Sequence, residues 1–183
     1  SVSRGLGDVY KRQTIMLKKV EPKELDFNVF SAIGDQWMLI TAGDKEDCNT
    51  MTASWGGLGI LWGSPIAIAY IRPQRYTKEF VDREEYFTLS FFGPEYRPQL
   101  ALCGSKSGRD VDKVAECGFT VATAAGDAPY FEEADMVLVC RKRMAQRMNP
   151  SYIPEDVREK WYPEGDYHTM YIGEIVEALV KHH

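Results

Sequence analysis

The sequence predicts a single, mainly β domain, a β-barrel decorated with short helices. Six or seven segments rich in β-branched and aromatic residues recur along the chain, and Gly, Pro or Asp turns separate them. The helical patterns between these segments are short. The 183 residues show no internal repeat and no linker, so one domain is expected over residues 16–183.

The strands are predicted from alternating or continuous apolar runs. Residues 66–71 are apolar at nearly every position, which favours a central strand. Residues 21–34 are expected to form an entry segment, and residues 62–65 a turn. The predicted strands cover residues 36–43, 49–55, 66–71, 86–92, 119–124, 136–148 and 170–180.

The helices are predicted from capping and turn residues. Thr77 is a candidate N-cap for a helix over residues 77–84. Pro98 lies near the first turn of another helix, which is expected to end at Gly104. Shorter helices are expected at residues 112–117 and, in an acidic surface insertion, at residues 154–161.

Composition restricts the classes of partner. The formal net charge is -5, and the cations of residues 1–13 reduce it, so the body of the chain is more acidic still. This argues against nucleic acid and against an anionic membrane surface as the main partner. The four cysteines are widely spaced, which predicts neither a metal site nor a disulfide framework. No apolar run reaches about 18 residues, and the expected compartment is the cytoplasm.

Residues 1–15 are expected to lie outside the fold. They have neither hydrophobic periodicity nor the apolar core of a secretory signal. The run from Asp8 to Gln13 resembles the translation of a sequencing-library adapter, so we expect an artefact of gene prediction and Met16 as the natural start. If the segment is genuine, it should be a disordered tail.

Three polar clusters favour a phosphorylated cofactor when they are taken together. In residues 49–55, hydroxyls at every second position would line one face of a strand that leads into the glycine-rich run 56–59, although an ordinary half-solvated strand shows the same pattern. Residues 72–77 place two arginines at a helix start, which suits phosphate or surface carboxylates. Residues 104–109 read as an anion-binding loop or as a flexible charged loop, and they lack the spacing of a P-loop.

The sequence shows no hydrolytic or metal-dependent machinery. His168 is the one histidine away from the C-terminus, and a lone histidine beside a strand is usually a packed residue. We therefore assign no catalytic residue and no metal ligand. Any chemistry is expected to belong to a cofactor.

Several of these segments, in the same order, resemble the flavin reductase-like, flavoredoxin-type family. The resemblance extends over about residues 27–180 and implies an FMN-binding split β-barrel of Greek key type, usually a homodimer with FMN near the subunit interface. Members of this family often have a histidine near the final strand, close to the flavin, and His168 occupies that place. Here Tyr167 separates Asp166 from His168, so we assign His168 no catalytic role. The segments that carry the resemblance are residues 49–55, 71–77, 86–91, 103–110 and 171–174.

The resemblance also implies the cofactor-binding residues. The isoalloxazine and ribityl chain would lie along Thr50, Met51, Thr52, Ala53, Ser54 and Trp55. The phosphate would be held by Arg75, Thr77, Ser105, Lys106 and Ser107. NAD(P)H would be a transient co-substrate, because the chain has no dinucleotide-binding glycine motif.

Three functions share all of these features. The first is an NAD(P)H-dependent flavin reductase, in which hydride passes from nicotinamide to FMN. The second is a non-enzymatic electron carrier that shuttles electrons between protein partners, with a redox protein as donor. The third is an FMN-binding protein with a regulatory or storage role.

Overall fold

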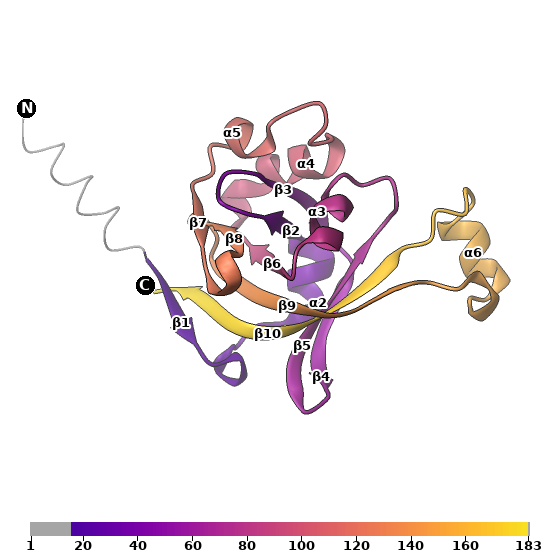
Figure 1. Cartoon of the computed structure of the whole chain (residues 1–183), viewed down its shortest axis with the longest axis horizontal. Coiled ribbons are helices and arrows are strands. Elements are labelled where there is room, and N and C mark those ends of the chain that lie inside the picture. The colour runs from indigo at the N-terminus through magenta and orange to yellow at the C-terminus, as the bar shows by residue number, and fades with distance from the viewer. Residues whose placement is uncertain (1–15, 183) are drawn as a thin grey trace, which may run out of the picture.

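The computed structural model describes residues 16–182 as a mainly antiparallel β structure with short helices (Figure 1). In that range, one sheet of eight strands has the order β3-β2-β6-β9-β10-β5-β4, with β1 paired to β10, and β7 and β8 form a separate ribbon. The expected tail, residues 1–15, lies outside the described residues. The strands are β1 (Leu17–Val20), β2 (Met38–Gly43), β3 (Cys48–Ala53), β4 (Gly56–Leu61), β5 (Ser64–Ile71), β6 (Tyr86–Phe91), β7 (Val121–Thr123), β8 (Pro129–Phe131), β9 (Met136–Arg147) and β10 (Thr169–Lys181).

Short helices cover one end of the sheet. The helices α3, α4 and α5 all pack against β3, and Figure 1 shows them gathered beside β2 and β3. This places their ends, and the loops that follow, around one strand. The helices are α2 (Val29–Ser31), α3 (Thr77–Arg83), α4 (Arg97–Ser105), α5 (Lys113–Cys117) and α6 (Glu155–Trp161), with a π-helical turn at Ala32–Gln36 and 3₁₀ turns at Pro22–Glu24, Pro94–Tyr96, Ala125–Asp127 and Pro150–Tyr152.

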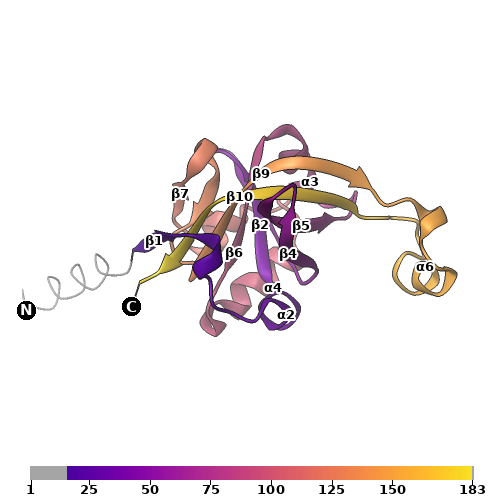
Figure 2. The same cartoon turned by 90° about the horizontal axis from the view of Figure 1, so that it is seen from below.

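The long strands β9 and β10 pair with each other in the middle of the sheet. The end of β9, the start of β10 and the segment between them project from the sheet, and we call this part the arm. The pairing of β9 and β10 shifts register at Gly173 and again after Ile175, and such bulges bend a strand. A Cβ at Gly173 would lie 2.6 Å from Cys140 Cβ and 2.7 Å from Phe87 Cζ, so only glycine fits this curve. Beyond the body, the arm carries α6 (Figure 2).

The sheet buries both of its faces. In β2, Met38 and Ile40 belong to one core cluster and Leu39 to another. In β9, Leu138 joins the first cluster and Val137 the second. Because successive side chains of a strand point to opposite faces, this alternation shows one core inside the barrel and a second one beneath α4, α5 and the β7–β8 ribbon.

Most of the predicted strands are present, with shifted ends. β5 lies between β10 and β4, so the segment predicted as a central strand is an internal strand, but it lies next to the edge strand β4. The strand predicted at residues 49–55 ends at Ala53, before Ser54 and Trp55. β1, β4 and β8 were not predicted. The glycine-rich β4 has little intrinsic strand propensity and owes its conformation to pairing with β5 across a tight turn in which Trp62 and Gly63 have positive φ.

Two details of the predicted helices were wrong. The N-cap of α3 is Tyr76, and Thr77 is the first helical residue. The Thr77 hydroxyl accepts a hydrogen bond from Asn49 Nδ2 at 2.8 Å. α4 continues through Gly104 to Ser105. There, a Cβ on Gly104 would come 3.2 Å from Thr52 Cβ, so the glycine allows α4 to approach β3 closely.

Candidate functional site

A cavity of about 320 Å³ lies at the end of β3, and we call it the aromatic cavity. Five of the six residues predicted along the flavin line it, including both Ser54 and Trp55. β5, the following loop and the arm supply the remaining wall. The lining residues are Met51, Thr52, Ala53, Ser54, Trp55, Tyr70, Arg72, Arg75, Trp161 and His168.

A smaller cleft of about 160 Å³ lies beside it and is lined by four of the five predicted phosphate residues, Arg75, Ser105, Lys106 and Ser107. Its walls carry three cationic side chains, Arg75, Lys106 and Lys113, and no carboxylate. We call it the cationic cleft. Arg75 lines both spaces, so the cleft and the aromatic cavity adjoin at this residue. The other lining residues are Gln74, Tyr76, Ser105 and Ser107.

Arg75 is held at the C-terminal end of α4. Its Nη1 donates to the carbonyl oxygen of Gly104 at 2.9 Å, and its Nη2 donates to that of Cys103 at 3.2 Å. A cation is favoured there, because the last carbonyls of a helix have no partner within the helix. A guanidinium has five N–H donors, so Arg75 retains donors for an anion in the cleft.

Lys113 is a cation that the sequence did not single out. Only 4% of it is exposed, and its Nζ donates to the carbonyl oxygens of Thr50 at 2.8 Å and Cys103 at 3.0 Å. Burial, and then the charge of Arg75, lower the pKa of Lys113 to about 8. A lysine at the first position of a short helix is normally solvent-exposed. The burial of Lys113 becomes apparent only in the tertiary structure, where α5 packs against β3.

Two predicted residues line neither space. Thr50 is fully buried, and its hydroxyl donates to the carbonyl oxygen of Ile40 at 3.2 Å. A second hydrogen bond joins Thr50 Oγ1 and Thr41 Oγ1 at 2.9 Å. Thr77 is 1% exposed and bound to Asn49. These two hydroxyls hold the strands and helices around the site together. Thr52 borders the aromatic cavity, but its hydroxyl donates to the carbonyl oxygen of Leu100 in α4.

The two arginines of residues 72–77 point to different parts of the site. Arg72 pairs with Asp166 of the arm, at 3.0 Å between Nη1 and Oδ2, and its guanidinium lies over the rings of Trp55 and Tyr162. Trp55 in turn makes an edge contact with Trp161. Arg72 therefore ties the arm to the rim of the aromatic cavity. Sequence spacing placed Arg72 and Arg75 in one cluster but could not separate these roles.

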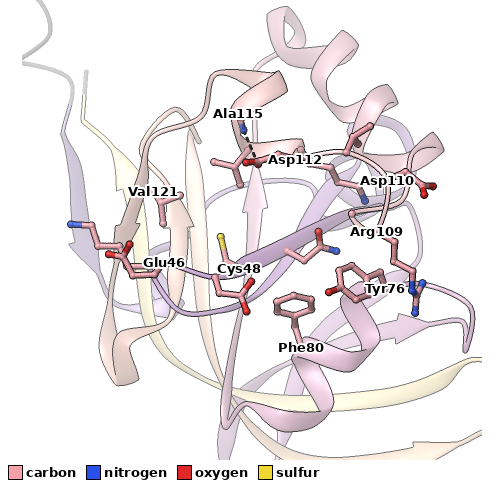
Figure 3. A pocket seen from close by; sticks show the side chains of 16 residues that line it. Glu46, Cys48, Tyr76, Phe80, Arg109, Asp110, Asp112, Ala115 and Val121 are labelled. Atoms are coloured by element: carbon pink, nitrogen blue, oxygen red, sulfur yellow. Dashed lines mark hydrogen bonds between the residues drawn. The ribbon is translucent and has the colours of Figure 1, made fainter.

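A larger hollow of about 530 Å³ also has Lys113 in its lining (Figure 3). Four carboxylates line it, Glu46, Asp47, Asp110 and Asp112, and they outnumber its cations Lys45, Arg109 and Lys113, so this hollow suits a phosphate less well than the cationic cleft does. The Asp112 carboxylate caps α5 by accepting a hydrogen bond from the Ala115 N–H. Burial raises the pKa of the Cys48 thiol to about 11, so this thiol stays protonated at pH 7. Over residues 16–182, no group of three or more His, Cys, Asp or Glu side chains is arranged to hold a metal ion.

None of the helices over residues 16–182 combines the length and the apolar character needed to cross a bilayer.

Comparisons with known proteins agree with this architecture. The chain resembles the FMN-binding domain of a flavin reductases-like enzyme from Shewanella baltica OS155, with a TM-score of 0.65 and 19% identity over 91% of this chain and 78% of that one. It also resembles the flavoredoxin of Desulfovibrio vulgaris (Miyazaki F), with a TM-score of 0.62 and 25% identity over 79% of this chain and 68% of that one.

A third similar structure is the styrene monooxygenase flavin reductase of Pseudomonas putida S12, with a TM-score of 0.57 and 16% identity over 78% of this chain and 77% of that one. No curated protein matches the sequence. The family model described as "Flavin reductase like domain" matches residues 30–183. The predicted family and the mainly β, split-barrel fold are thus confirmed, and the chain belongs to the flavin reductase like domain family.

Proposed function

We propose that this chain binds FMN and acts as an NAD(P)H-dependent flavin reductase. One observation carries the proposal: an aromatic cavity and a carboxylate-free cationic cleft adjoin at Arg75. A planar ring joined by a short chain to a phosphate requires two such neighbouring environments. FMN has this shape and charge, and the similar structure from S. baltica is described as FMN-binding.

The residues present fit this cofactor. The phosphate would be held by Arg75, Lys106 and Lys113, with Ser105 and Ser107 as hydrogen-bond donors. The ring would lie against β3 from Met51 to Trp55. Thr50 and Thr77 contribute indirectly, because their hydroxyls hold β3 against β2 and α3.

When bound, FMN supplies the redox chemistry, accepting a hydride from NAD(P)H and releasing electrons to an acceptor. The chain would position the reacting groups. Trp55 and Trp161 contact each other edge to face in the wall of the aromatic cavity, and Arg75 joins the ring and phosphate environments. Hydride transfer needs no general base, so a site without a catalytic acid–base pair is compatible with this activity.

We further propose that a second copy of the chain covers the open side of the site. A largely apolar groove of about 630 Å³ adjoins the aromatic cavity and shares Ser54, Trp55 and Tyr70 with it. Phe30 stands in this groove with 87% of its surface exposed. An apolar surface of this kind, continuous with a binding site, suits an interface, and a homodimer would enclose the cofactor.

The alternative function is an electron carrier, and the similar flavoredoxin of D. vulgaris keeps it open. A regulatory or storage role would use the same FMN site. The three differ in the electron donor that they accept, rather than in their binding residues.

The test begins with purified protein and added FMN. A flavin absorption spectrum retained through gel filtration supports FMN binding, and its absence rejects all three functions. Anaerobic addition of NADH and then NADPH distinguishes them: rapid bleaching of the flavin supports the reductase. Reduction by a ferredoxin-like protein without bleaching by either nucleotide would instead establish the carrier.

A further inference from the structure

Tyr162 and His168 form a buried pair in the arm, at the edge of the aromatic cavity. Tyr162 follows α6 and His168 precedes β10, and each is 7% exposed. Tyr162 Oη lies 2.6 Å from His168 Nδ1, a short distance for a hydrogen bond. The imidazole also lies 5.3 Å from the Trp55 ring, between centroids, and it lines the cavity.

Both side chains of the pair are neutral at pH 7. Burial, followed by the positive charge of Arg72, lowers the pKa of His168 to about 4, against an opposing effect of Asp166. Burial likewise raises the pKa of Tyr162, with Arg72 acting in the other direction. The phenol therefore keeps its proton, and the imidazole carries only one.

The position of that one imidazole proton follows from the hydrogen bond. The phenol proton has two acceptors within reach, His168 Nδ1 at 2.6 Å and Met148 Sδ at 3.4 Å. A thioether is a weak acceptor, so the phenol donates to Nδ1. An accepting Nδ1 carries no proton, which leaves the proton on Nε2. Nε2 forms no hydrogen bond with the described residues, although the ring borders the cavity.

We propose that Tyr162 is a positioning residue that fixes His168 as its Nε2–H tautomer, so that the aromatic cavity presents a neutral hydrogen-bond donor to an acceptor on the ring of bound flavin. The carbonyl oxygens and unprotonated ring nitrogens of an isoalloxazine are such acceptors. A neutral donor avoids the cost of burying a further positive charge in a cavity that Arg72 and Arg75 already line beside its aromatic rings. The ligand half of this inference rests on the proposed FMN site; the tautomer half does not.

The tautomer is measured on protein without FMN, by nitrogen-15 NMR of the imidazoles between pH 6 and 8. We expect the Nε2–H pattern for His168 in the parent chain. In Tyr162→Phe, which removes only the hydroxyl, we expect a mixture of tautomers. The control is Tyr167→Phe, because the Tyr167 ring packs against Tyr162 at 4.8 Å between centroids but makes no hydrogen bond to His168. An Nδ1–H pattern in the parent, or an unchanged pattern in Tyr162→Phe, overturns the proposal.

The ligand half is measured as the FMN dissociation constant. Loss of one neutral hydrogen bond should weaken binding by about threefold to tenfold in Tyr162→Phe, and leave Tyr167→Phe within twofold of the parent. Equal affinity of Tyr162→Phe and the parent overturns the role toward flavin, even if the tautomer shifts. A parent chain that binds no FMN overturns the proposed function and this half together, whereas the NMR result still decides the tautomer.

Discussion

Arg75 joins the two halves of the site, and its contribution can be isolated together with that of Lys106. We expect Arg75→Ala with Lys106→Ala to weaken FMN binding at least tenfold, about 1.4 kcal/mol, because both remove charge-assisted donors from the cationic cleft. Titration calorimetry measures this. The control pair, Lys45→Ala with Arg143→Ala, removes equal charge outside both spaces and should bind as the parent does. An unchanged dissociation constant in the first pair would remove both residues from the phosphate site.

We expect Lys113 to make the affinity for FMN depend on pH. A phosphate nearby favours the ammonium, so the complex retains a proton that the free protein loses above its pKa of about 8. Binding then takes up a proton, and affinity should fall as the pH rises from 7 to 9. Lys113→Met should bind more weakly at pH 7 and lose this dependence. In the control, exposed Lys45→Met, the dependence should persist. Constant affinity of the parent over this range would contradict the role.

The Lys113 ammonium should affect the free energy of unfolding in the opposite direction, so that stability rises with pH where affinity falls. The pKa of Lys113 is about 8 when folded and 10.5 as an ordinary lysine. Between these values the unfolded chain binds more protons than the folded one, so this group makes the free energy of unfolding rise with pH in that window. Urea unfolding at pH 7 and pH 9, in the parent and in Lys113→Met, separates this contribution from that of other groups.

At the scale of elements, β10 positions the site through its bend. Gly173→Ala would force a Cβ against Cys140 and Phe87, and overpacking of this kind costs about 1–3 kcal/mol. We expect a lower free energy of unfolding by urea denaturation. Gly59→Ala in β4 is the matched control, because its Cβ would meet nothing within 4 Å and should have little effect. Equal destabilisation by the two changes would show that the close contact at Gly173 is unimportant.

Elements differed in how well the sequence predicted them. β2, β5 and β6 carry runs of β-branched and aromatic residues, and these local preferences agree with the fold. β4 reads as Gly-Gly-Leu-Gly-Ile-Leu and becomes a strand because it pairs with β5. Its pairing is a tertiary contact that overrides weak local propensity. The same limit applied to β1, whose four residues are ordered by pairing with the far end of β10.

At the scale of the whole molecule, the open groove beside the site predicts a dimer. Phe30→Glu places a charge in the apolar groove, and we expect sedimentation to give the mass of one chain instead of two. Val176→Glu on β10, also a change at an exposed apolar residue but outside the groove, should leave the dimer intact. A parent chain that sediments as a monomer would contradict the proposed assembly.

The sequence by itself determined the mainly β class, the order of most elements, the family and the three polar segments that meet at the site. These follow from local periodicity, turn residues and a recognisable succession of motifs. Only the tertiary structure decided which side chains face the cavities. Thr50 and Thr52 share one face of β3 by spacing, yet Thr50 packs against Thr41 inside the sheet and Thr52 reaches α4.

Tertiary structure also decided the positions of Lys113 and His168. Lys113 contacts the carbonyl oxygen of Thr50 and His168 contacts the ring of Trp55, both distant in the sequence, and no local pattern encodes these contacts. Lys113 is buried because α5 packs on β3, and His168 lines the cavity because the arm returns beside Trp55. Periodicity reports which face of an element is buried, whereas the partner on that face depends on how distant elements pack.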